Sequence, residues 1–273
     1  MLIAFNGATT MKADLATDIH VAWAAGYDLL EIWAAKLDDY LAAHSMAELK
    51  DLFTKVRPYS INSIEQITFR HQAGYQEVQA RCRRLSEIAQ ALDCPYIVVV
   101  PSPLPAGMSK DEVRNESVRV LRDLAGIAAE HRIGLAFEFL GFADCSVNNL
   151  ADCWKIVEEV NRENVGLVID TFHFHVGSST LQSLGEIDPA KLFIFHINDA
   201  EDRPKEQLTD AQRLLPGEGI IPLKDILAAL KEIGYDRLVS IELFRPEYWE
   251  WEPLRVAQEA KERIEGLLHG LPG

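Results

Sequence analysis

The stretch EHRIGLAFEF, residues 130–139, contains the features from which we predict the fold. A pattern with helical periodicity covers residues 111–130 and ends in a polar turn before Gly134. The apolar run that follows has the composition of a strand that is buried on both faces. A single acidic residue, Glu138, interrupts this run near its end. The stretch therefore predicts a helix, a turn and a buried strand that ends in a carboxylate.

The same unit of helix and strand recurs along the whole chain. The expected strands cover residues 2–5, 29–33, 59–64, 96–100, 134–139, 165–170, 192–198 and 238–243. Longer helical patterns separate these runs, and eight such units in 273 residues match a TIM barrel, for which about 250 residues are typical. We therefore predict an α/β protein with a single (β/α)8 TIM barrel, in which residues 1–273 form one domain.

An open, doubly wound sheet is the main alternative to the barrel. Such a sheet usually carries a glycine-rich phosphate-binding motif after its first strand, and neither GxGxxG nor GxxxxGK[ST] occurs there. Eight units also exceed what one such sheet usually holds. The barrel is therefore favoured.

The charge balance restricts the partners that we expect. The chain has 27 Lys and Arg against 42 Asp and Glu, a formal net charge of −15. A protein that follows a phosphate backbone normally has a basic stripe, and the sequence has none, so we expect no nucleic-acid partner. No stretch approaches the roughly 20 apolar residues of a membrane helix, so we expect no membrane association.

The N-terminus and the cysteines indicate a cytoplasmic protein. The stretch MLIAFNGATT has neither the basic region nor the long apolar region of a secretory signal. The four cysteines form no CxxC pair and are too few for a disulfide framework, so we expect reduced thiols. A homo-oligomer is compatible with the sequence.

Four of the expected strands end in a residue that can bind a metal ion. In chain order these residues are Glu138, Asp170, His196 and Glu242. Catalytic groups of a TIM barrel lie at the carboxyl ends of its strands, so we expect the four side chains to converge there. Each one alone would more simply be a helix cap, an ion-pair partner or a hydrogen-bonded core residue. Their common position on consecutive strands favours a shared site.

A divalent metal ion explains why such residues are acceptable in buried strands. An ionised carboxylate in an apolar strand is costly without a partner, and one cation would offset this cost for all three carboxylates. Three carboxylates and one imidazole, without thiolates, suit Mn²⁺, with Zn²⁺, Co²⁺ and Mg²⁺ as alternatives. We therefore predict one divalent ion as the cofactor.

Three further residues are candidates for substrate binding. Asn6 and Trp33 stand at the ends of the first two strands, where side chains line the mouth of a barrel. Trp33 would offer a flat wall to a ring, although an aromatic residue at a barrel rim more commonly serves packing. Arg213 lies on the long loop after the seventh strand, where a guanidinium can clamp a substrate oxygen. The alternative for Arg213 is a solvated arginine on a loop.

Segments along nearly the whole chain resemble one known superfamily. These segments include FNGATT at 5–10, GYDLLEI at 26–32, AFEFLG at 136–141, NRENVGLVIDTFHFH at 161–175, IFHINDAED at 194–202 and ALKEIGYDRLVSIELFRPEYW at 229–249. They are similar to the xylose-isomerase-like TIM-barrel superfamily of sugar isomerases and epimerases. Within it, the likeness is closest to the inosose (2-keto-myo-inositol) isomerases of inositol catabolism.

The resemblance implies a function for individual residues. It makes Glu138, Asp170, His196 and Glu242 the metal ligands, and Glu138 and Glu242 also the acid and base of catalysis. It makes His173 a substrate contact, for which the alternative is a hydrogen bond to a metal-binding carboxylate; His175 is left without a role. The reaction it implies is the isomerisation of an unphosphorylated keto-polyol, most simply 2-keto-myo-inositol, by proton transfer through an enediolate.

Other reactions of the superfamily remain as alternatives. One is the isomerisation or epimerisation of another keto-sugar, of the 3-epimerase or hydroxypyruvate-isomerase type, and a second is a dehydratase of the dehydroshikimate type. Phosphodiester hydrolysis like that of endonuclease IV needs more histidines near the rim and a less acidic surface. The sequence departs from related inosose isomerases at the barrel mouth, where Gly7 replaces an acidic residue and Trp33 a basic one.

Overall fold

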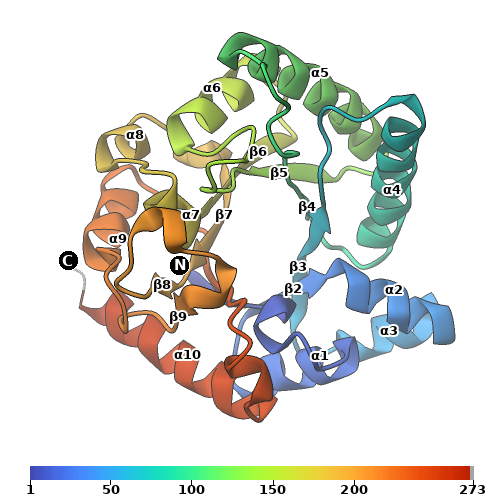
Figure 1. Ribbon diagram of the computed structural model, residues 1–273. Helices are drawn as coiled ribbons and strands as arrows, with labels where there is room; N and C mark the ends of the chain where they lie inside the picture. Colours follow the sequence, from blue (N-terminus) through green and yellow to red (C-terminus); the bar gives the residue numbers. More distant parts are fainter. Residues whose placement is uncertain (271–273) are drawn as a thin grey trace.

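The computed structural model describes residues 1–270 and has the predicted barrel architecture (Figure 1). Eight parallel strands close on one another in the order β1-β10-β7-β6-β5-β4-β3-β2. They are β1 (Leu2–Asn6), β2 (Leu29–Trp33), β3 (Arg57–Ile64), β4 (Tyr96–Val99), β5 (Gly134–Glu138), β6 (Val165–Asp170), β7 (Leu192–Ile197) and β10 (Leu238–Ile241). All eight expected strands are therefore confirmed, and only their ends differ, by one or two residues.

Helices surround the barrel on its outside (Figure 1). The α-helices are α1 (Leu15–Ala24), α2 (Ala34–Ala43), α3 (Met46–Leu52), α4 (Gln72–Ala91), α5 (Lys110–Ala129), α6 (Leu150–Val160), α7 (Thr171–Val176), α8 (Leu181–Gly185), α9 (Leu223–Glu232) and α10 (Pro253–His269). Short 3-10 helices are η1 (Gly7–Thr10), η2 (Pro189–Lys191), η3 (Lys205–Gln207), η4 (Asp210–Gln212) and η5 (Tyr248–Glu250). The helix expected over 111–130 is α5. Ser109 and Glu112 form a reciprocal capping box at its N-terminus.

A small antiparallel sheet after β7 is not predicted by the sequence. Its strands, β8 (Asp199–Ala200) and β9 (Arg213–Leu214), have two residues each. Strands of this length are too short to show the alternation by which a strand is recognised. The pairing of Ala200 with Arg213 brings the start of β9 back to the end of β7.

The interior of the barrel changes from apolar to polar toward the carboxyl ends of its strands. Ala4, Leu29, Ala136, Val168 and Ile194 belong to the inner apolar cluster. Because side chains alternate along a strand, the residues two positions further on face the same interior, one layer nearer the carboxyl ends. That layer contains Asn6, Glu31, Glu138, Asp170 and His196. The fold therefore aims these polar side chains at one another.

The structure bears on two features of the sequence, the state of the cysteines and the character of the helices. All four cysteines are buried and free of disulfides, which confirms the expectation from their spacing. Within residues 1–270, no helix has both the length and the apolar character needed to cross a membrane.

Candidate metal centre

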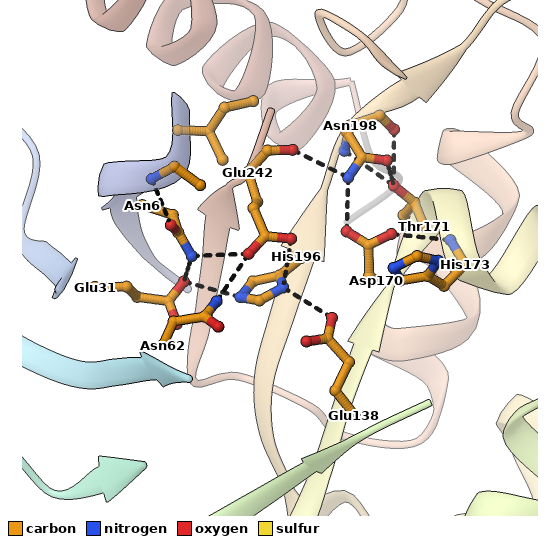
Figure 2. A network of polar contacts seen from close by, with 12 residues as sticks. Asn6, Glu31, Asn62, Glu138, Asp170, Thr171, His173, His196, Asn198 and Glu242 are labelled. Carbon is orange, nitrogen blue, oxygen red and sulfur yellow. Dashed lines mark hydrogen bonds and ion pairs between the residues drawn. The ribbon is translucent and has the colours of Figure 1, made fainter. Parts of the chain in front are cut away.

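Glu138, Asp170, His196 and Glu242 converge at the carboxyl end of the barrel (Figure 2). One potential ligand atom of each residue lies within 4.8 Å of those of the other three. Glu138 and Asp170 are the last residues of β5 and β6, and Glu242 directly follows β10. All four residues are buried. The structure thus brings together the four side chains that the sequence analysis singled out.

His196 stands between carboxylates on both sides of its ring. Its Nδ1 lies 3.3 Å from Oε1 of Glu138 and 3.3 Å from Oε2 of Glu242. Its Nε2 lies 3.0 Å from Oε1 of Glu31. The ring therefore presents Nδ1 to the other candidate ligands.

The side chain of Glu242 accepts hydrogen bonds on both of its oxygens. Its Oε1 accepts from the amide nitrogens of Asn6 at 3.0 Å and Asn62 at 2.8 Å. Its Oε2 accepts from Nη1 of Arg213 at 3.1 Å. These three donors hold the carboxylate of Glu242 in one orientation.

Asp170 is oriented by donors on both of its oxygens. Oδ1 accepts from the backbone nitrogen of His173 at 2.9 Å and so caps α7. Oδ2 accepts from Nδ2 of Asn198 at 2.6 Å and from Nη1 of Arg213 at 2.8 Å. Three donors from different parts of the chain therefore fix the position of this carboxylate.

Glu138 has a different environment from Glu242. Burial, together with the charges of Glu242 and Asp170, raises the pKa of Glu138 to about 7, although contact with His196 opposes this change. A buried carboxyl with a pKa near neutrality can gain or lose a proton at physiological pH, which suits an acid or base in catalysis.

The donor set fits a divalent metal ion. Burial alone favours a neutral His196, yet the charges of Glu242 and Glu31 outweigh it and raise the pKa of the ring well above its usual value. The site therefore stabilises positive charge at the point where the three carboxylates meet. Oxygen and imidazole donors of this kind, without thiolates, are those preferred by Mn²⁺ and Zn²⁺.

A cavity of about 380 Å³ opens beside these residues. Ligand pockets of small molecules begin at about 300 Å³. Polar side chains at its inner end include Glu138, Glu242, His173 and Arg213, and its apolar side chains include Trp33, Leu140, Phe142 and Phe244. A small ligand in this cavity would therefore have carboxylates next to it and aromatic rings within reach.

The residues expected to bind substrate take up two kinds of position. Trp33, His173 and Arg213 line the cavity. Trp33 packs with Phe244, with ring centroids 5.5 Å apart. Asn6 is completely buried and is not among the cavity-lining residues; its amide contacts Glu242 instead. Because Asn6 faces inward at the end of β1, it reaches a candidate ligand.

Arg213 and His173 form a buried pair. Arg213 is only 1% exposed, so the alternative of a solvated loop arginine is wrong. Its Nη2 lies 3.1 Å from Nε2 of His173. Burial, and then the charge of Arg213, lower the pKa of His173 to about 3, so the ring is neutral. Since the guanidinium can only donate, Nε2 accepts and the proton of this ring is on Nδ1.

Three residues that contact the candidate ligands are not predicted by the sequence. Glu31 contacts His196, Asn62 contacts Glu242, and Asn198 contacts Asp170. Glu31 carries the same signal as the four predicted ligands, since it interrupts the apolar run LLEIW of β2. The asparagines are indistinguishable in the sequence from other polar residues near strand ends.

A buried ion pair explains the glycine at position 7. A Cβ atom on Gly7 would lie 2.7 Å from Oδ2 of Asp18 and 3.3 Å from Cβ of Trp33. Asp18 is held there by Nζ of Lys36 at 2.7 Å and by the hydroxyl of Thr10 at 2.7 Å. An acidic side chain at residue 7 would therefore have to displace a buried pair.

Comparisons with known proteins agree with the resemblance predicted from the sequence. A model of the family described as xylose isomerase-like TIM barrel matches residues 19–267. The inosose isomerase of Bacillus velezensis is 39% identical over 272 residues, which cover 98% of this chain and 97% of that protein. The inosose isomerase of Bacillus subtilis is 39% identical over 265 residues, with 96% and 95% covered.

A solved structure extends this similarity to three dimensions. The crystal structure of the IolI protein with a bound zinc atom matches with a TM-score of 0.97 and 38% identity, and the match covers 100% of both chains. The barrel and the path of the chain around it are therefore shared with that protein.

Proposed function

The chain belongs to the xylose isomerase-like TIM barrel family and is an isomerase, and from this premise we propose that it isomerises 2-keto-myo-inositol, an inosose. The observation that carries the proposal is that two glutamates line one cavity and belong to a set of four side chains able to hold a metal ion. The similarity to inosose isomerases from end to end of the chain supports the choice of substrate.

The proposed metal ligands are Glu138, Asp170, His196 and Glu242, with His196 binding through Nδ1. A divalent ion held by them supplies positive charge that stabilises the negative charge developing on the substrate oxygens. The three carboxylates favour Mn²⁺, and Zn²⁺, which is bound in the IolI structure, is the alternative. The donors on Glu242 and Asp170 keep both carboxylates oriented for this task.

Glu138 and Glu242 are proposed to move the protons. In the isomerisation, a C–H bond breaks at the hydroxyl-bearing carbon and the proton of that hydroxyl leaves, so that a carbonyl forms there. A C–H and an O–H bond form at the former carbonyl group. One glutamate removes the carbon-bound proton and the other delivers a proton to the neighbouring carbon. They extend from β5 and from the end of β10, so they approach the cavity from different strands.

Arg213 and His173 are proposed to orient the substrate. Both are buried at the cavity and are joined by a hydrogen bond, so neither can turn away without leaving a polar group unpaired. Arg213 is also held by Oδ1 of Asp210 at 2.9 Å, and its charge is shared with Asp170 and Glu242. A guanidinium that is already paired with carboxylates suits a hydroxyl or carbonyl oxygen better than a phosphate.

The substrate is proposed to be uncharged. The side chains around the cavity include the acidic residues Glu65, Asp144 and Asp210, and the net charge of the chain is −15. These charges disfavour an anionic ligand, whereas a cyclitol ketone presents hydroxyl groups to the carboxylates and C–H groups to Trp33 and Phe244.

A substrate panel tests this function. The protein loaded with Mn²⁺, and separately with Zn²⁺, is incubated with 2-keto-myo-inositol, with unphosphorylated ketohexoses and with a ketohexose phosphate. We expect the highest kcat/KM for the inosose and the lowest for the phosphate. A higher kcat/KM for a ketohexose, with inversion at one carbon, would instead identify an epimerase.

A further inference from the structure

Glu31 is a buried carboxylate for which the reaction described above has no use. It lies on β2, its exposed fraction is 0%, and it does not line the cavity. An isolated buried carboxylate is very unfavourable, so its partners are the first indication of what it does. Its Oε1 faces Nε2 of His196 at 3.0 Å and its Oε2 accepts from Oγ of Ser60 at 2.6 Å.

Glu31 lies on the opposite side of the His196 ring from the other carboxylates. Glu138 and Glu242 contact Nδ1, whereas Glu31 contacts Nε2 (Figure 2). One ring nitrogen therefore faces the proposed metal ligands and the other faces Glu31. Glu31 is thus not a fifth member of the ligand group but a neighbour of one ligand.

The contact with Glu31 determines which nitrogen of His196 carries a proton. An ionised carboxylate only accepts hydrogen bonds, so the nitrogen that faces Glu31 has to donate. Nδ1 also faces carboxylates, those of Glu138 and Glu242, but a metal ion held by them would take the lone pair of Nδ1, so the proton of the neutral ring would be on Nε2. A histidine ligand whose second nitrogen donates to a carboxylate is oriented by it and becomes a stronger donor to a metal ion.

The fold holds Glu31 firmly in this position. β2 and β7 are not neighbours in the barrel, since β1 and β10 lie between them. Both side chains face the interior because each follows an inward-facing apolar residue by two positions, Leu29 in β2 and Ile194 in β7. Ser60 on the adjacent strand β3 fixes the far oxygen of Glu31.

We propose that Glu31 is a positioning residue, which accepts the Nε2 proton of His196 and thereby aims Nδ1 at the metal ion. This inference rests on the proposed metal centre but is independent of the substrate. Its consequence is that Glu31 controls the affinity for the metal, although it touches neither the metal nor the cavity.

The test compares the metal affinity of Glu31→Gln with that of the wild type. Glutamine keeps the size of the side chain and removes the charge that favours a proton on Nε2. We expect the dissociation constants of Zn²⁺ and Mn²⁺, measured by competition with a chelating dye, to rise by about 10- to 100-fold. In assays, the metal concentration needed for half-maximal activity should rise accordingly, while kcat at saturating metal changes less.

Asp18→Asn is the matched control. Asp18 is also a buried carboxylate and forms an ion pair with Lys36, but it contacts none of the proposed metal ligands. We expect it to lower the thermal stability and to leave the metal dissociation constants within about twofold of the wild type. A loss of affinity in both variants would show a general effect of destabilisation, and this would overturn the inference.

NMR spectra of ¹⁵N-histidine-labelled protein loaded with Zn²⁺ give a second signature. In the wild type, His196 should show a proton on Nε2 and metal bound at Nδ1, and the Nε2 proton should shift upfield in Glu31→Gln. If Glu31→Gln does not fold, Ser60→Ala, which frees the far oxygen of Glu31, should weaken metal binding several-fold.

Three outcomes separate the inference from the proposed function. If the wild type binds no divalent metal ion, the proposed metal centre itself is wrong. A wild type that binds metal, with unchanged affinity in Glu31→Gln (or in Ser60→Ala, should the former not fold), would overturn only the role of Glu31. Metal bound at Nε2 of His196 would do the same.

Discussion

The two glutamates proposed to move protons differ in their immediate surroundings. Glu242 accepts hydrogen bonds from the amides of Asn6 and Asn62 and from the guanidinium of Arg213. Glu138 is buried with His196 as its polar contact, and its pKa is raised to about 7. Glu138 is therefore the member of the pair that should titrate near neutrality in the metal-free protein.

The titration of Glu138 should be visible in the stability of the metal-free protein. Between its ordinary pKa of 4.5 and its folded-state value of about 7, the folded protein binds more protons than the unfolded chain. The contribution of Glu138 to the free energy of unfolding is therefore full below about pH 4.5 and is lost as the pH rises toward 7. Relative to Glu138→Gln, the wild type should become less stable over this range.

Urea unfolding in EDTA, repeated at several pH values for both proteins, measures this difference. The comparison with Glu138→Gln removes the contributions of other groups, such as His173, whose lowered pKa acts in the opposite direction. If the free energy of unfolding of the wild type, relative to that of Glu138→Gln, stays constant or increases as the pH rises, the environment assigned to Glu138 is wrong.

Single residues of the site were predictable to different degrees. Glu138, Asp170, His196 and Glu242 can be recognised because each interrupts an apolar run at the end of an expected strand. Glu31 does the same in LLEIW, but only the closed barrel shows that it reaches a histidine on β7, from which β1 and β10 separate it. The roles of Asn6 and Asn62 depend on contacts across the barrel, and no local pattern in the sequence contains them.

Secondary-structure elements were predicted where the pattern is long enough to be periodic. The eight barrel strands and α5 follow from apolar runs and helical periodicity. The β8–β9 sheet does not, because its strands have only two residues each, and a buried side chain, Asp199, supports it through tertiary contacts. Both oxygens of Asp199 accept backbone hydrogen bonds, from Ala200 at 2.9 Å, Ile221 at 2.9 Å and Gly217 at 3.0 Å.

Removing the Asp199 carboxylate should loosen the segment that carries Arg213. Asp199→Ala leaves buried backbone N–H groups without acceptors, at a cost of about 1–3 kcal/mol for each group. We expect a lower free energy of unfolding and, because Arg213 loses its fixed position, a rise of about tenfold in KM for the inosose. Denaturant unfolding and steady-state kinetics measure the two effects.

Ser109→Ala is the control for this change. It removes the cap of α5 on an exposed surface and should cost about 1 kcal/mol of stability with no change in KM. If Asp199→Ala also leaves KM unchanged, the segment after β7 does not position the substrate.

At the scale of the whole molecule, the fold concentrates negative charge at one end of the barrel. Four buried carboxylates meet there, with Arg213 and His196 as the nearby cationic groups. The alternation of strand and helix patterns alone predicts the barrel. The barrel in turn predicts that residues at the carboxyl ends of its strands lie close together. The sequence does not show which way each side chain points at the carboxyl end of the barrel. This direction decides whether a residue binds the metal ion, contacts a metal ligand or lines the cavity.

Metal removal should destabilise the whole molecule. An ion that binds only the folded state stabilises it by about 2.7 kcal/mol at a hundredfold excess over Kd. We expect EDTA to lower the Tm of the wild type and Mn²⁺ or Zn²⁺ to restore it, and Asp170→Asn to show a much smaller EDTA effect. Asp18→Asn, away from the site, should keep the full effect. An identical Tm with and without EDTA in the wild type would exclude the metal centre.

The central claim is that this isomerase acts by proton transfer between its substrate and two glutamates, and isotope incorporation tests it most directly. The metal-loaded protein is incubated in D₂O with 2-keto-myo-inositol, and the product is analysed by NMR for deuterium on the former carbonyl carbon. We predict solvent deuterium at that carbon, and a fall in kcat of about 10²–10⁴ in Glu138→Gln and Glu242→Gln, with substantial metal still bound. Product without solvent deuterium, or near-normal turnover in both variants, would show instead that hydrogen moves directly between the carbons and that the two glutamates serve only as ligands.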